Sequence, residues 1–98
     1  MKPCDCVING LEFTLTSLGC PEQYDIFKDG KQVGYFRLRH GWLSVWSPGV
    51  FDNLLFECDY GDALCGQLKD KDRARYLKIV AHVINKKIFS INFCENRL

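Results

Sequence analysis

Apolar and polar residues alternate along much of the first 60 positions, and this period of two is that of β-strands. Residues 11–16 are the clearest case, because Leu11, Phe13 and Leu15 are apolar whereas the residues between them are polar. A strand with this alternation buries one face and leaves the other in water, as in antiparallel sheets. The strands predicted in this way cover residues 4–8, 11–16, 24–28, 32–39, 42–46 and 53–60.

Short turn sequences separate these predicted strands. Asn9-Gly10 and Asp29-Gly30 favour two-residue type I′ hairpins, because both positions of such a turn need a positive φ. His40-Gly41 and Ser47-Pro48-Gly49 are predicted to be further turns. Short connections of this kind predict an antiparallel meander. Within residues 53–60, strict alternation places Leu54 and Phe56 on the same face.

From about residue 70 the apolar period changes from two to 3.6, which predicts an α-helix over about 70–88. Its apolar stripe consists of Ala74, Leu77, Val80, Ala81, Ile84 and Ile88. Asp70 is the expected N-cap. The tail over 89–98 has no clear period, and we expect it to dock as a short strand or to pack against the edge of the sheet.

The sequence therefore predicts an α+β fold: an antiparallel β-meander of five to six strands with one C-terminal α-helix packed on one face. The 98 residues form a single domain, 1–98, with the sheet over 4–60. The opposite face of the sheet is expected to be open to solvent. The pattern does not say which face the helix covers.

Composition narrows the class of protein. Nearly half of the residues are hydrophobic (47%), which is enough for one core, and no apolar run approaches the roughly 20 residues of a membrane span. The first ten residues lack the apolar stretch of a signal peptide, so we expect a cytoplasmic protein whose six cysteines are reduced. The net charge of +1 lacks the basic excess that is typical of nucleic-acid binders.

The stretch GCPEQYDIFKDGKQVGYFRLRHG, residues 19–41, carries a resemblance. Its segments CPEQY, VGY and RLRHG, together with Gly30, resemble a signature of small uncharacterised proteins from Gram-positive bacteria, their phages and their mobile elements. The resemblance covers about a quarter of the chain. It implies a phage or mobile-element setting and a fold with the helix last. No activity is assigned to that family, so it implies no catalytic residues.

The candidate binding residues lie on two adjacent predicted strands. They are Tyr35, Arg37, Arg39, Trp42 and Trp46, and alternation places all five on one face. Three interpretations stay open. The aromatic rings and arginines pack on one another as half-buried cation–π pairs, they form a protein-binding hot spot, or they stack bases and grip phosphates.

Other chemistries find less support in the sequence. Structural zinc sites space paired cysteines by two to four residues, whereas one residue separates Cys4 from Cys6 and no second pair has ligand spacing. We therefore predict no metal, no cofactor and no catalytic residues. If Glu57 or Asp59 lies opposite Arg37 or Arg39, the two would form a cross-strand ion pair.

These observations lead to a hypothesis and an alternative. The first is a small non-enzymatic protein-interaction module of phage or mobile-element origin, whose partner is another protein or a second copy of itself. The alternative is a nucleic-acid-binding module that uses the same face. Neither needs a membrane.

Overall fold

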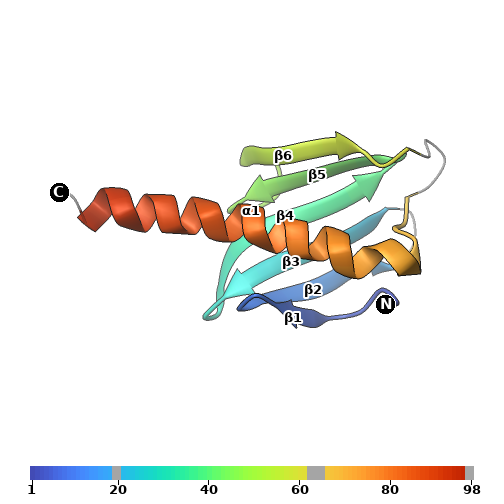
Figure 1. The fold of residues 1–98 in the computed structure, drawn as a ribbon, viewed down its shortest axis with the longest axis horizontal. Helices are drawn as coiled ribbons and strands as arrows, with labels where there is room; N and C mark the ends of the chain where they lie inside the picture. Colours follow the sequence, from blue (N-terminus) through green and yellow to red (C-terminus); the bar gives the residue numbers. More distant parts are fainter. Residues whose placement is uncertain (19–20, 62–65, 97–98) are drawn as a thin grey trace.

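The computed structural model describes residues 1–18, 21–61 and 66–96 of the chain. Within these residues a six-stranded antiparallel sheet is followed by one long helix, α1 (Asp70–Asn96) (Figure 1). The strands are β1 (Cys6–Ile8), β2 (Leu11–Leu18), β3 (Glu22–Lys28), β4 (Lys31–Arg39), β5 (Trp42–Ser47) and β6 (Asn53–Asp59). Each strand pairs with the next, so their order across the sheet equals their order in the chain. The predicted α+β meander is confirmed.

Three of the five strand connections are two-residue turns with the same backbone conformation. The φ angles are 51° and 79° at Asn9-Gly10, 52° and 79° at Asp29-Gly30, and 52° and 75° at His40-Gly41. Two successive positive φ values define the type I′ turn, whose twist matches that of the strands it joins. These turns fix the register of β1–β2, β3–β4 and β4–β5.

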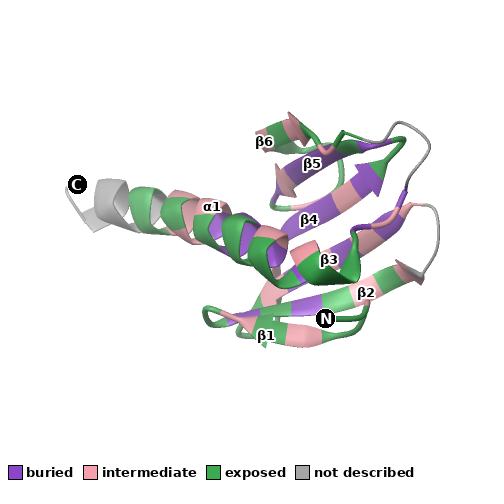
Figure 2. Cartoon of the chain, turned by 45° about the vertical axis from the view of Figure 1, so that its right-hand side comes forward, coloured by how far each residue is buried: buried purple, intermediate pink, exposed green. Residues whose placement is uncertain are grey.

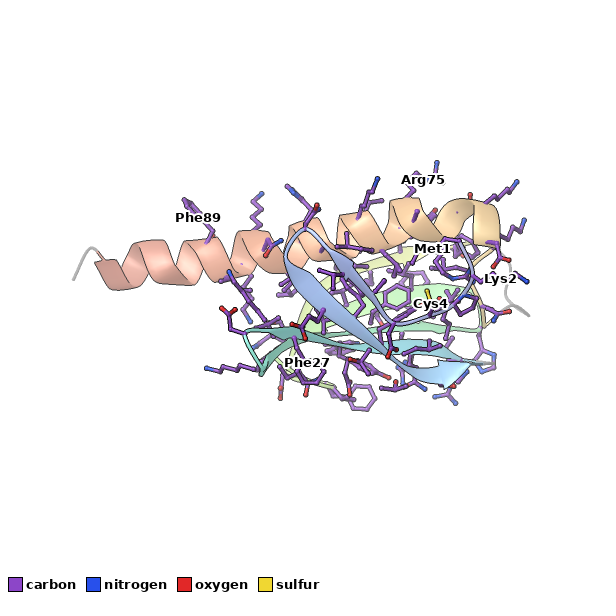
Figure 3. All side chains as sticks on the ribbon, turned by 90° about the horizontal axis from the view of Figure 1, so that it is seen from below. Met1, Lys2, Cys4, Phe27, Arg75 and Phe89 are labelled. Atoms are coloured by element: carbon purple, nitrogen blue, oxygen red, sulfur yellow. The ribbon has the colours of Figure 1, made fainter. Side chains whose placement is uncertain are left out.

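Helix α1 covers the face of the sheet that carries Phe36 and Leu38 of β4, which we call the inner face. Its side chains Leu77, Val80 and Ile84 belong to the same core. Figure 2 shows the buried positions concentrated in the middle of the sheet and exposed positions on both edge strands. The side of the sheet away from α1 is the outer face, and no other element of the described residues covers it (Figures 1 and 3).

Gly34 of β4 lets the helix approach the sheet closely. A Cβ atom at this position would lie 2.4 Å from Cδ1 of Ile84 and 3.4 Å from the backbone oxygen of Trp46. Ile84 is fully buried, so its side chain has little room to move away. Glycine here removes the side chain that would otherwise hold α1 and β4 apart.

A β-bulge in β6 overturns one predicted alternation. The β5–β6 register shifts between Val45 and Trp46, which pair with Phe56 and Leu54 respectively. Leu55 is the extra residue, and it reverses the sides of the residues before it. Leu54 therefore shares the outer face with Trp46 instead of sharing the inner face with Phe56, and it is exposed.

The helix differs from the prediction at both ends. It continues to Asn96, so the predicted boundary at 88 and a short strand in the tail are wrong. The packing of the tail against the edge of the sheet stays a prediction. At the start, the carbonyl of Lys69 accepts the hydrogen bond of Arg73 N–H, so Lys69 occupies the N-cap position predicted for Asp70. Ala74 is exposed, and Arg73 takes its predicted place in the buried stripe.

Arg73 belongs to a buried polar cluster that joins α1 to β3. Its side chain and that of Glu22 are fully buried, and its Nε and Nη2 lie 2.9 Å and 3.0 Å from the two carboxylate oxygens of Glu22. The Tyr24 hydroxyl and the Leu68 N–H also donate to this carboxylate, at 2.6 Å and 3.0 Å. The remaining guanidinium N–H groups donate to the backbone oxygens of Leu68 and Met1 and to the Asp70 carboxylate.

Candidate functional site

The five predicted binding residues all lie on the outer face. Tyr35 pairs with Trp46 and Arg39 pairs with Trp42 across β4 and β5, while Arg37 lies opposite Ser44. Directly opposed residues of antiparallel strands point to the same side of the sheet. Figure 3 shows Phe27 of the neighbouring strand β3 pointing away from α1 on this same side. The face predicted from alternation therefore exists, and no helix or other strand of residues 1–18, 21–61 and 66–96 lies over it.

Tyr35 is not available as a contact residue. It is only 4% exposed, and its hydroxyl donates a hydrogen bond to the side-chain oxygen of Gln23 on β3. Burial raises the pKa of Tyr35, so the phenol stays neutral. The prediction placed Tyr35 on the correct face but at the wrong depth, because neighbouring side chains close over its ring.

Trp46 is half-buried. The ring of Phe51 stands edge-on against its indole, with ring centroids 5.4 Å apart and an interplanar angle of 85°. The indole N–H is buried and has no hydrogen-bond partner among the described residues. Trp46 thus packs against Phe51, and Phe51 is the more exposed of the two rings.

Phe51 is presented by a strained loop between β5 and β6. Its φ is +60°, a left-handed conformation that is unfavourable for a bulky side chain. The loop is held by two hydrogen bonds, from Gly49 N–H to the Asp52 carboxylate at 2.9 Å and from Asp52 N–H to the Gly49 carbonyl at 3.2 Å. The exposed ring lies beneath the Arg37 guanidinium, whose Cζ is 5.1 Å from the ring centroid.

Exposed apolar side chains gather on and beside this part of the outer face. Trp42, Phe51 and Leu54 are 46%, 59% and 44% exposed, and Val50 next to Phe51 is 46% exposed. Val50, Phe51 and Leu54 were not identified as binding residues from the sequence. The available signal was a pair of apolar residues directly after Pro48-Gly49, where a turn would normally carry polar side chains.

Charged residues on the outer face form separate rows. Arg37 and Arg39 lie on β4 whereas Glu57 and Asp59 lie on β6, and β5 runs between them. Among the described residues, none of these four side chains forms an ion pair. The predicted cross-strand ion pair is therefore wrong, and the Glu57 carboxylate instead accepts a hydrogen bond from the Trp42 indole at 2.9 Å.

We define the outer patch by the residues that share this half of the face. It comprises Arg37, Arg39, Trp42, Phe51, Leu54, Glu57 and Asp59. The aromatic and aliphatic side chains form its centre, the arginines border it on β4, and the carboxylates border it on β6. Such a surface can bury apolar area and match charges, and it brings no nucleophile and base together.

The cysteines and acidic residues of the described chain were also predicted to hold no metal. Among the described residues, no three His, Cys, Asp or Glu side chains come close enough together to bind an ion. Cys4, Cys6 and Cys58 are free thiols, and burial raises the pKa of the latter two. Cys20 and Cys65 lie outside the described residues.

No protein-family model, curated protein or solved structure matches the chain. In the described part of the chain, no helix combines the length and the apolar character needed to cross a membrane.

Proposed function

We propose that the protein is a small non-enzymatic interaction module that binds another protein through the outer patch. The observation that carries this proposal is the exposure of Trp42, Phe51 and Leu54 on a sheet face that no described element covers. Aromatic anchors bordered by arginine are the composition of interface hot spots. The strained backbone of Phe51 supports the same proposal, because strain that presents an apolar ring to water is unfavourable for stability alone.

The charge of the outer face favours a protein partner over nucleic acid. Arg37 and Arg39 share this face with Glu57 and Asp59 on β6 and with Asp25 on β3. A phosphate backbone approaching the arginines would meet carboxylates on both sides. A protein can instead offer acidic groups over β4 and basic groups over β6, with apolar side chains between them.

Two further supports concern the rest of the chain. The buried ionisable groups Glu22, Tyr24 and Arg73 are bonded to one another, which supports a structural role for them. The phage or mobile-element setting and the cytoplasmic location remain predictions. In such a setting, the partner would be a protein of the bacterial host or of the element itself.

The test is affinity capture from a bacterial lysate with tagged protein. Wild type is compared with Trp42→Ser/Phe51→Ser and with a matched control, Val7→Ser/Ile79→Ser, which removes exposed apolar side chains elsewhere. We expect a protein that wild type and control retain and that the patch variant loses. Nuclease treatment and salt are varied in parallel, because phosphate contacts weaken steeply with ionic strength.

Equal capture by wild type and patch variant would contradict the proposal. Recovery of nucleic acid that is released at high salt, and that depends on Arg37 and Arg39, would favour the alternative instead.

A further inference from the structure

We propose that the outer patch binds a second copy of this chain, in a two-fold dimer whose axis runs along β5. This inference rests on the proposed function, because it names the partner of the same surface. Charges and rings cross the outer face in an order that a two-fold axis along β5 brings into register.

Two rows of residues cross the outer face at right angles to the strands. One row is Arg39, Trp42, Asp59 and the other is Arg37, Ser44, Glu57, each running from β4 through β5 to β6. In both rows the cation and the carboxylate stand at equal distances on either side of β5. Among the described residues, none of these four charged groups forms an ion pair within the chain.

A two-fold axis parallel to β5 converts these rows into matched contacts. Rotation about this axis places β4 of one copy over β6 of the other and keeps each residue at the same height along the strands. Arg39 then faces Asp59 of the second copy, and Arg37 faces Glu57. Four ion pairs follow from the register, whereas an axis perpendicular to the strands between the two rows would place arginine against arginine.

The apolar residues fit the same axis. Trp42 and Ser44 lie on β5 itself, so each meets its own counterpart. Phe51 of the following loop stands edge-on against Trp46 of β5, so its ring also lies near the axis. The exposed apolar residues of the patch therefore cluster around the axis.

The area of the dimer interface determines how tightly the two copies are expected to bind. Overlap extends over three strands about 4.8 Å apart and about 20 Å long, which is roughly 300 Å² of flat outline per copy. Both copies together contribute roughly 600 Å², which is below the roughly 1,000 Å² of a stable interface, so the dimer is weak. We expect a reversible dimer that forms between about 10 μM and about 1 mM.

The test is charge exchange followed by sedimentation equilibrium. The acidic variant carries Arg37→Glu/Arg39→Glu, and the basic variant carries Glu57→Lys/Asp59→Lys. Each places like charges across the interface in its own homodimer, whereas a mixed dimer has all four contacts opposite in sign. We expect the mass of wild type to rise from 11.3 kDa towards the dimer value with concentration. Each variant alone should associate at least tenfold more weakly, and an equimolar mixture should associate at least as well as wild type.

A helix-face control separates this geometry from general charge attraction. Lys71→Glu/Lys78→Glu changes two exposed residues of α1 and lowers the net charge from +1 to −3, as the acidic variant does. It should self-associate like wild type, and mixing it with the basic variant should not reproduce the gain of the acidic–basic mixture. Circular dichroism establishes that every variant is folded.

Two results would overturn the dimer: a wild type that stays monomeric to about 1 mM, or a mixture that does not restore association. If capture from lysate still depends on Trp42 and Phe51, the proposed function stands and its partner is a different protein. If capture does not depend on them either, both proposals fail.

Discussion

Arg73 carries a full positive charge in the core of a small domain, and the fold satisfies it completely. Glu22 supplies the opposite charge, and the remaining N–H groups donate to the Asp70 carboxylate and to the backbone carbonyls of Leu68 and Met1. Burial alone lowers the pKa of Arg73, but the hydrogen bonds to Glu22 and Asp70 outweigh burial and raise it. A pair of this kind contributes little compared with apolar residues of the same shape, yet removing one member leaves an uncompensated buried charge.

The first prediction concerns this buried pair. Arg73→Met should lower the free energy of unfolding by about 3–5 kcal/mol, because the Glu22 carboxylate loses its counter-charge. Adding Glu22→Gln should restore a large part of the loss, because the amide oxygen can still accept from Leu68 N–H. Urea denaturation of the three proteins provides the measurement. A loss below about 1 kcal/mol in the single variant, or a double variant no more stable than the single, would contradict it.

The second prediction concerns Tyr24 and high pH. Burial and the hydrogen bond to Glu22 raise the pKa of Tyr24 well above its ordinary value near 10. The folded state therefore keeps a proton that the unfolded state loses, so this stabilisation is complete below pH 10 and is lost as pH rises above it. Above pH 10 the unfolding free energy of wild type should fall as pH rises. In Tyr24→Phe this slope should be shallower, by up to about 1.4 kcal/mol per pH unit.

Urea denaturation between about pH 8 and pH 11 measures both slopes. Tyr35 and Tyr60 also have raised pKa values and remain in both proteins, so the difference in slope isolates Tyr24. Parallel curves for wild type and Tyr24→Phe would rule out this linkage.

At the residue scale, the sequence predicted which face of the sheet a side chain points to, but it did not predict how deeply that side chain is buried. Alternation with period two assigns each side chain to a face, so Arg37, Arg39 and Trp42 were placed correctly. The burial of Tyr35 depends on the side chains that surround it in space, and these cannot be identified from the neighbouring sequence. The Glu22–Arg73 pair was missed, although Glu22 stands in step with Tyr24 and Ile26 and so pointed inward from the start.

At the scale of elements, the loop between β5 and β6 combines strain with exposure. Phe51 holds a positive φ while exposing an aromatic ring, and both features oppose folding stability. Stability and function are expected to conflict at such a position.

The third prediction follows from this loop. Phe51→Asn should keep or increase the free energy of unfolding, by up to about 1 kcal/mol, because asparagine tolerates the left-handed conformation better than phenylalanine. The same variant should lose partner capture and dimer formation. Thermal unfolding and sedimentation measure the two effects on one sample. A marked loss of stability would mean that the contact with Trp46 matters more than the backbone strain.

The two ends of α1 were not equally predictable from the sequence. Its start was predicted to within one residue, because the change of period at about 70 is sharp. Its end was placed eight residues early, because the apolar stripe becomes irregular after Ile88. The stronger signal was the absence of any glycine or proline from residue 70 to 98, which leaves nothing to stop the helix. The bulge at Leu55 had no such signal, since an extra residue does not disturb the composition of a strand.

At the scale of the whole molecule, the connectivity is as simple as a sheet allows. Every strand pairs with its neighbour in sequence, whereas the contacts between α1 and the sheet close much longer loops, such as the 51 residues from Glu22 to Arg73. Loop closure makes distant contacts slow to form. The order of strands therefore suggests that the hairpins form before the helix docks.

The fourth prediction tests this order. Ile84→Val removes one methyl group from the centre of the helix–sheet contact and should destabilise the fold by about 0.5–1.5 kcal/mol. If α1 docks late, most of this change appears as faster unfolding, with little change in the refolding rate. Stopped-flow refolding and unfolding in urea give both rates. A refolding rate that falls by the full amount would place the helix in the folding nucleus.

An open meander also has two edge strands, and β6 has a consequence of its own. An unpaired strand is a template on which further chains can add, and long flat edges lead to ribbons and fibrils. Along β6, the extra residue at Leu55 breaks the regular spacing of N–H and C=O groups, and the charges of Glu57 and Asp59 would repel a second copy of the same strand. At the other edge, β1 is three residues long. Both edges are thus poor starting points for fibril growth, although the chain exposes tryptophan and phenylalanine on its surface.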